Sequence, residues 1–228
     1  MSSIRRLVTG RRDVPQLWAK IAELSSACAG ATKCTEAAFL SVASGDRQAA
    51  ISEAQKVNAA VRKGMALVRE SRRMLIQADL SSPVHDDALV ILESSRDLLE
   101  SAKAASCVIV QRRLSPSVVS LLNDPKFQFS LSKLFEKVGQ AATSLLEAIG
   151  SLPSSPSKSA ELSSSVSKMV EDVDSARLYL LERLYEQEKS IDVLSLMQLR
   201  DIIYYGSRLV ESFDDCSESL QALATAKT

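Results

Sequence analysis

The sequence has few of the residues that interrupt helices or favour sheets. Its 228 residues include only seven glycines and four tyrosines, and runs of β-branched residues are rare. Alanine, leucine, serine, glutamate and arginine dominate instead, so local propensity leans strongly toward helix. We therefore expect an all-α protein.

Long apolar runs are also absent. No stretch reaches the length of about 18 apolar residues that a membrane-spanning helix needs. The first 13 residues, MSSIRRLVTGRRD, hold four arginines but lack the apolar stretch of a secretory signal. We expect a cytoplasmic protein, whose contact with the inner face of the membrane would be peripheral.

Neither sign of charge is in surplus, because 28 basic side chains balance 28 acidic ones. A nucleic-acid-binding protein usually carries a basic surplus or stripe, so we expect no nucleic-acid partner. The cysteines form no CxxC pair, and buried free thiols in a reducing compartment explain them better than disulfides do. They are Cys28, Cys34, Cys107 and Cys216.

Motifs typical of enzymes are missing as well. There is no GxxxxGK[ST], GxGxxG, GxSxG or HExxH pattern, and an active site usually needs a nucleophile beside a base, or a paired acid and base. The single histidine, His85, falls in the first turn of an expected helix, where a surface or capping role is more typical. We expect no enzymatic activity.

Apolar residues recur along the chain in alternating steps of three and four, which is the period of amphipathic helices. One such apolar seam reads Val84, Ala88, Ile91, Ser95, Leu98, Ala102, Ala105 and Ile109, and the last reads Leu199, Ile203, Gly206, Val210, Phe213, Ser217, Leu220 and Ala224. The pattern predicts six long helices, at 14–43, 46–79, 83–113, 129–149, 160–188 and 192–226.

Prolines divide these helices into two sets of three. Ser115-Pro116 and Asn123-Asp124-Pro125 interrupt the pattern, because proline disfavours helix at the residue before it. We interpret 116–127 as a short helical turn plus a loop, and GSLPSSPSKS (150–159) as a connection. The predicted architecture is two consecutive antiparallel three-helix bundles. Its parts are a basic tail (1–12), a first bundle (13–113), a connecting loop (114–128) and a second bundle (129–228).

Acidic residues line several helices at helical spacing: Glu93, Asp97 and Glu100; Glu171, Asp172 and Asp174; and Glu211, Asp214, Asp215 and Glu218. Stripes of oxygen ligands on adjacent helices can hold a hard cation or iron. The alternative is a solvated acidic face balanced by Arg96, Arg177, Arg183 and Arg208, and the sequence by itself favours this alternative.

Four segments carry recognisable acidic motifs: VHDDA (84–88), RDLLE (96–100), VEDVD (170–174) and LLERLYEQEKSIDVLSLMQLRDII (180–203). Together with the order of helices, these segments resemble the PhoU-like superfamily. Within that superfamily the chain is similar to the shorter branch of phosphate transport regulators, often encoded beside a Pit-type phosphate permease. Members of that branch have two three-helix bundles in one chain and bind metal clusters at intact acidic motifs.

The resemblance implies where a metal would lie. The middle-helix motif of the first bundle reads AQKVN (54–58) and has no carboxylate. A divalent cation or iron is therefore expected in the second bundle, among Asp174, Glu211 and Asp214. Asp97 and Glu100 are weaker candidates in the first bundle, where only Asn58 lies opposite.

The resemblance also implies a function. The chain would be an accessory or regulatory protein of inorganic phosphate transport that binds a membrane phosphate permease of the Pit type, or its signalling partner. A homodimer is a further expected assembly, and the arginines of the 1–12 tail (Arg5, Arg6, Arg11 and Arg12) would either meet acidic lipid or a partner, or remain solvated. The alternative is a helical adaptor or scaffold protein unrelated to phosphate. A carboxylate-bridged metal enzyme is the weakest reading, because Glu-x-x-His pairs are absent.

Overall fold

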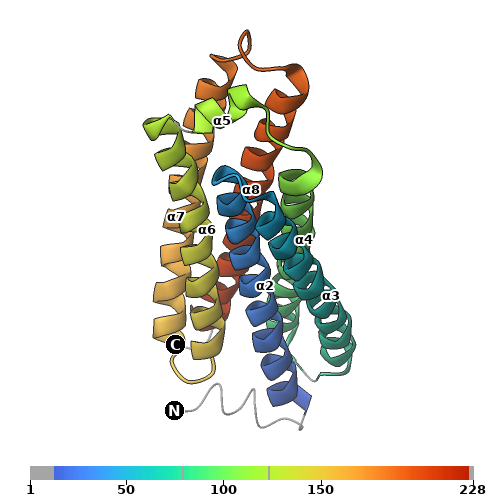
Figure 1. Cartoon of the computed structure of the whole chain (residues 1–228). Coiled ribbons are helices and arrows are strands. Elements are labelled where there is room, and N and C mark those ends of the chain that lie inside the picture. The colour runs from blue at the N-terminus through green and yellow to red at the C-terminus, as the bar shows by residue number, and fades with distance from the viewer. Residues whose placement is uncertain (1–12, 79, 123, 226–228) are drawn as a thin grey trace.

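The structure, a computed structural model, describes residues 13–78, 80–122 and 124–225 as helices joined by short connections (Figure 1). These residues contain no strand, which confirms the all-α prediction. Six of the helices are long and one is short. They are α2 (Asp13–Ala43), α3 (Arg47–Gln77), α4 (Ser82–Gln111), α5 (Pro116–Leu122), α6 (Pro125–Ser151), α7 (Pro156–Tyr185) and α8 (Val193–Thr225).

The short helical turn predicted within 116–127 is present, but the loop predicted after it is shorter than expected. That stretch contains α5, and α6 begins at Pro125 rather than at 129. Asp124 caps α6, because its side chain accepts hydrogen bonds from the backbone nitrogens of Lys126 (3.1 Å) and Phe127 (2.9 Å). Proline at the first helical position needs no hydrogen-bond partner for its nitrogen, so Pro125 starts a helix instead of extending a loop.

Proline at the start of a helix also makes the connection shorter than the one predicted at 150–159. Helix α6 continues to Ser151, and α7 starts at Pro156 with Ser155 before it. The Ser159 hydroxyl donates a hydrogen bond of 2.9 Å to the Ala148 carbonyl, which joins the first turn of α7 to the end of α6. Antiparallel helices with so short a connection must pack side by side.

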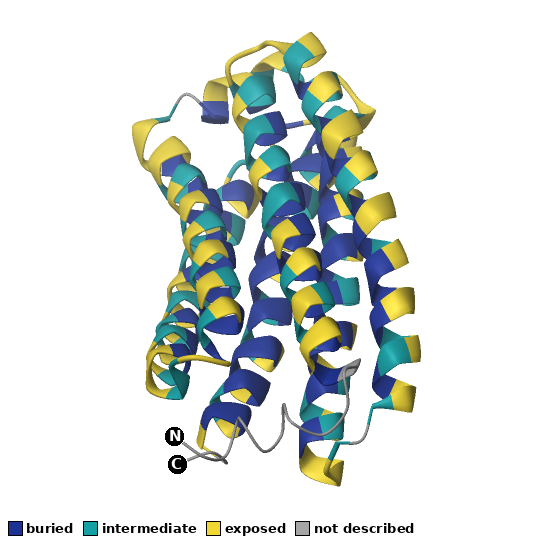
Figure 2. Cartoon of the chain, turned by 90° about the horizontal axis from the view of Figure 1, so that it is seen from below, coloured by how far each residue is buried: buried dark blue, intermediate teal, exposed yellow. Residues whose placement is uncertain are grey.

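Each set of three long helices packs together, α2 with α3 and α4, and α6 with α7 and α8. The two sets are not separate, however, because α4 packs along α8 and α2 packs against α6. Helices α2, α4, α6 and α8 therefore form a central group, with α3 and α7 on its flanks (Figure 1). One continuous hydrophobic core runs through both halves, and each helix turns its buried side inward (Figure 2).

Burial follows the predicted seams. Every predicted seam residue of α4 and α8 is buried, and Leu98 is only 1% exposed. The flanking helices α3 and α7 include apolar residues that are only partly buried, such as Met65 and Met169, since these helices have neighbours mainly within their own half.

All four cysteines are free, but only Cys28 and Cys216 are buried. The expectation of burial is wrong for Cys34, which is half-buried, and for Cys107, which is exposed. Cys34 packs against the edge of the core, whereas Cys107 faces outward. Within the described ranges no helix is long and apolar enough to cross a bilayer. The 1–12 tail lies outside the described residues.

Candidate functional site

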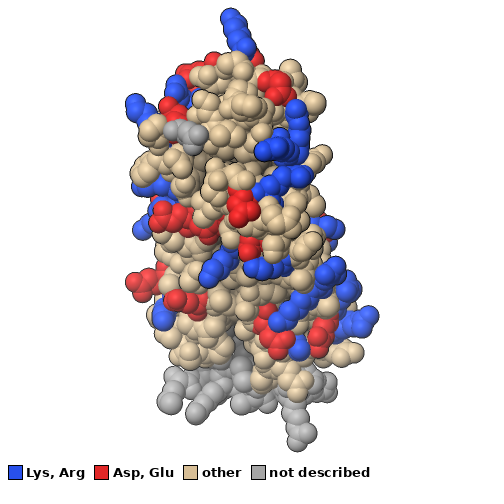
Figure 3. Space-filling model, viewed as in Figure 1, with Lys and Arg blue, Asp and Glu red and all other residues tan. Residues whose placement is uncertain are grey.

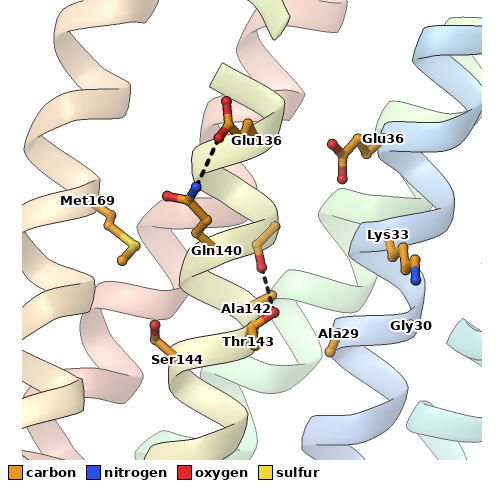
Figure 4. Close-up of a pocket in the computed structure, with 11 residues that line it drawn as sticks. Ala29, Gly30, Lys33, Glu36, Glu136, Gln140, Ala142, Thr143, Ser144 and Met169 are labelled. Carbon is orange, nitrogen blue, oxygen red and sulfur yellow. Dashed lines mark hydrogen bonds between the residues drawn. The ribbon is translucent and has the colours of Figure 1, made fainter. Parts of the chain in front are cut away.

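A groove of about 660 Å³ lies where the two halves of the molecule meet. Helices α2 and α6 form its walls, and α7 contributes one residue (Figure 4). The groove is lined by Ala29, Gly30, Lys33, Glu36, Glu136, Gly139, Gln140, Ala142, Thr143, Ser144 and Met169. Its volume falls within the range of about 300–1,000 Å³ that is usual for ligand-binding pockets.

Residue size explains why the groove opens here. At one end α2 and α6 are held together by Phe39 and Phe135, whose rings stack with centroids 4.6 Å apart. One turn farther along α6 the walls are still close, because a Cβ on Gly139 would lie 3.2 Å from Oε2 of Glu36. The walls lie apart farther along, about two and a half turns from Phe39, where nothing lies within 4 Å of the position that a Cβ on Gly30 would take.

Two glutamates from the two halves share the groove. Glu36 extends from α2 toward α6 and is half-buried, whereas Glu136 on α6 is exposed (Figure 4). The pKa of Glu36 is raised, first by burial and second by the negative charge of Glu136, while Lys33 acts in the opposite direction. Glu136 accepts a hydrogen bond of 3.0 Å from the Gln140 side chain.

Neither glutamate has a counter-ion in the part of the chain that the structure describes: Glu36 and Glu136 form no ion pair within 4.0 Å there. Elsewhere on the same face, acidic and basic side chains are interspersed (Figure 3). The groove can therefore bind a cationic group, which would relieve the repulsion between the two carboxylates.

The carboxylates predicted to bind a metal in the second half lie on α7 and α8. Asp174 pairs with Arg177 (Nη2–Oδ1 3.1 Å), and Glu211 pairs with Arg208 (Nη1–Oε2 2.8 Å). Asp214 is half-buried, and its Oδ1 atom has no hydrogen-bond partner. Two of the three candidate ligands are thus already engaged by cations on their own helices.

The candidates in the first half are engaged in the same way. Arg96 on α4 lies 2.9 Å from Asp97 (Nη2–Oδ1) and 3.9 Å from Glu100 (Nε–Oε1). Across the described residues, no group of three or more His, Cys, Asp or Glu side chains is placed to hold a metal ion. The geometry gives no support to the metal prediction, and it matches the alternative of an acidic face balanced by arginines.

The single histidine does not line the groove. His85 sits in the first turn of α4, 3.5 Å from the carboxylate of its neighbour Asp86. Inside the groove, the Thr143 hydroxyl donates to the Gly139 carbonyl at 3.0 Å. The groove-lining residues include neither histidine nor cysteine.

Sequence reasoning did not single out Glu36 or Glu136. The available signal was glycine within helices, since Gly30 and Gly139 occupy helix interiors where glycine costs about 0.5–1 kcal/mol relative to alanine. A helix that keeps such residues often approaches another group closely or leaves space beside itself. Pairing residues about 100 positions apart required the tertiary structure.

Comparison with known proteins gives a result for structure alone. No family model matches the sequence, and no curated protein matches it. Two crystal structures from Shewanella oneidensis MR-1 match the fold, each with a TM-score of 0.75 over 92% of this chain and 99% of theirs. One is of a PhoU-like protein, 16% identical, and the other is of a candidate PhoU-like phosphate regulatory protein, 18% identical.

These likenesses extend over nearly the whole chain and include both halves. They agree with the resemblance seen in the order of helices. This chain has the fold of the PhoU-like proteins.

Proposed function

We propose that the protein regulates inorganic phosphate transport by binding another protein at the cytoplasmic face of the membrane. The proposed partner is a phosphate permease of the Pit type or its signalling partner. The observation that carries this proposal is the fold, shared over 92% of the chain with a candidate phosphate regulatory protein. The match covers 99% of the matching chain.

The chemistry of the surface supports binding rather than catalysis. The groove offers carboxylates, an ammonium group and an amide, without a nucleophile paired to a base. Large apolar side chains are also exposed where α7 turns into α8, including Val193 (71%), Leu194 (63%) and Met197 (44%). Exposed apolar side chains that gather in one region are typical of protein-interaction surfaces.

A co-purification experiment tests the proposal. The full-length protein, tagged and expressed at native level, is recovered from membranes of cells grown with scarce or abundant phosphate. Enrichment of a phosphate permease, together with altered phosphate uptake when the gene is deleted, is the expected result. A helical adaptor unrelated to phosphate would instead enrich soluble proteins and leave phosphate uptake unchanged.

The arginines of the 1–12 tail allow a second test of the proposal. Near an anionic leaflet each arginine adds about 1 kcal/mol of attraction, and salt screens it. Removing residues 1–12 should weaken membrane association and leave the melting temperature unchanged. A large loss of stability would show that the segment is structural, and unchanged association would remove it from the contact with the membrane.

A further inference from the structure

The groove between α2 and α6 carries charge that has no counter-ion within 4.0 Å among the described residues. Two glutamates and one lysine among its lining residues leave one net negative charge. Glu136 affects the pKa of Glu36 more strongly than Lys33 does. Lys33 is exposed and does not neutralise the pair. Isolated like charges destabilise a fold unless a ligand of opposite sign engages them.

The shape of the groove limits what can enter. On α2 the lining extends from Ala29 to Glu36, and on α6 from Glu136 to Ser144, which corresponds to about 10–12 Å at 1.5 Å per residue. This is two helical turns, longer than a metal ion or a small amine requires. It matches one long side chain together with the adjoining backbone of an extended segment.

A guanidinium or ammonium group is the complement of this site. Arginine presents a planar fork of donors that can engage two carboxylates at once, and it loses less hydration than lysine does. The aliphatic stem of such a side chain would lie along Ala142 and Met169, which also line the groove. Lysine and arginine are concentrated in the cytoplasmic loops of membrane proteins.

We propose that the groove between α2 and α6 binds a basic cytoplasmic loop of the membrane partner, with one arginine or lysine side chain held between Glu36 and Glu136. The inference rests on the proposed function and adds the binding site and the chemistry of the segment that occupies it. The two walls come from different halves of the molecule, so the bound loop contacts both halves at once.

Two variants of the full-length protein test the site. Glu36→Gln with Glu136→Gln removes both charges and keeps side-chain size. Gly30→Leu fills the groove at a position with no atom within 4 Å of a Cβ. The matched control is Glu147→Gln with Glu161→Gln, which removes two exposed carboxylates of α6 and α7 outside the groove lining. Circular dichroism and thermal melts establish that every variant folds.

The probe is inside-out membrane vesicles with or without the overproduced permease, and the readout is co-sedimentation at two salt concentrations. Both groove variants should bind permease vesicles about tenfold more weakly or worse, because each loses charge-assisted contacts or access. The control should bind within about twofold of the wild type. Glu36→Lys with Glu136→Lys should lose binding and regain it with a permease whose loop arginines and lysines are changed to glutamate.

The outcomes separate the two proposals. If the wild type binds permease vesicles and both groove variants bind equally well, the groove assignment is overturned while the regulatory function stands. If the wild type binds vesicles with and without permease alike, it recognises lipid, which overturns the groove assignment. If the wild type never binds the permease in vesicles or in the co-purification, the proposed function itself is overturned.

Discussion

Replacing Leu98 by alanine probes the core that the two halves share. Leu98 is 1% exposed on α4 and borders an internal cavity of about 10 Å³. The same cavity is lined by residues of α2, α6 and α8, among them Cys28, Leu145 and Phe213. Leu98 therefore lies at the centre of the four-helix group and not inside one bundle.

The cost follows from this position. A buried leucine replaced by alanine destabilises proteins by about 2–5 kcal/mol, and more when the surroundings cannot collapse into the space. Four helices surround Leu98, so we expect a value in the upper half of that range. Asp97→Ala is the control, because the side chain is 49% exposed and pairs only with Arg96 on its own helix. An exposed pair of this kind contributes about 0–1 kcal/mol.

Urea melts followed by two signals measure both effects. Fluorescence of the single tryptophan, Trp18 on α2, reports on the first half, while far-ultraviolet circular dichroism reports on all helices. Because one core runs through both halves, the two signals should change together for the wild type and for Leu98→Ala. Equal midpoint shifts for Leu98→Ala and Asp97→Ala, or two separate transitions in the wild type, would refute this reasoning.

Three further predictions concern charge. The pKa of Glu36 is raised above its ordinary value of 4.5, so ionised Glu36 destabilises the fold. Glu36→Gln should therefore raise the melting temperature at neutral pH, and this gain should vanish as the pH falls below about 4.5. The pKa of Asp192 is lowered from 3.8 to about 2 by hydrogen bonds from Ser195 and then from Arg112. The stabilisation by ionised Asp192 is therefore present above about pH 4 and is lost between about pH 4 and 2. Asp192→Asn should flatten the pH dependence of stability in that window, and an unchanged slope would contradict the assignment. Metal titration by calorimetry tests the predicted ligands of the second half, Asp174, Glu211 and Asp214. Replacing all three by alanine should abolish any tight metal site. A tight site that survives would place the metal elsewhere.

The sequence by itself determined the helices and the sides they bury. Seam residues such as Leu98 and Phe213 are buried as predicted, because helical periodicity is a local property that three- and four-residue steps record directly. Some of the counter-charges were also local, although Glu93 and Asp172 pair with cations on neighbouring helices. Arg96, Arg177 and Arg208 neutralise acids within four positions on their own helices, and that spacing can be read from the chain.

The sequence determined the helix boundaries at proline less closely than it determined the buried sides of the helices. A proline disfavours helix before it and favours helix after it, so Asp124-Pro125 fits both a loop and a helix start. The hydrogen bonds that Asp124 accepts from the first turn of α6 decided for the helix.

Only the tertiary structure decided how the halves combine. The packing of α4 on α8 and of α2 on α6 merges two expected bundles into one core, since seam patterns give the buried face of a helix but not the neighbour that covers it. The groove has the same origin. Glu36 and Glu136 are a hundred positions apart, and no local spacing relates them. They face a common space because the Phe39–Phe135 stack joins α2 to α6 at one end while small residues leave the walls apart beyond it.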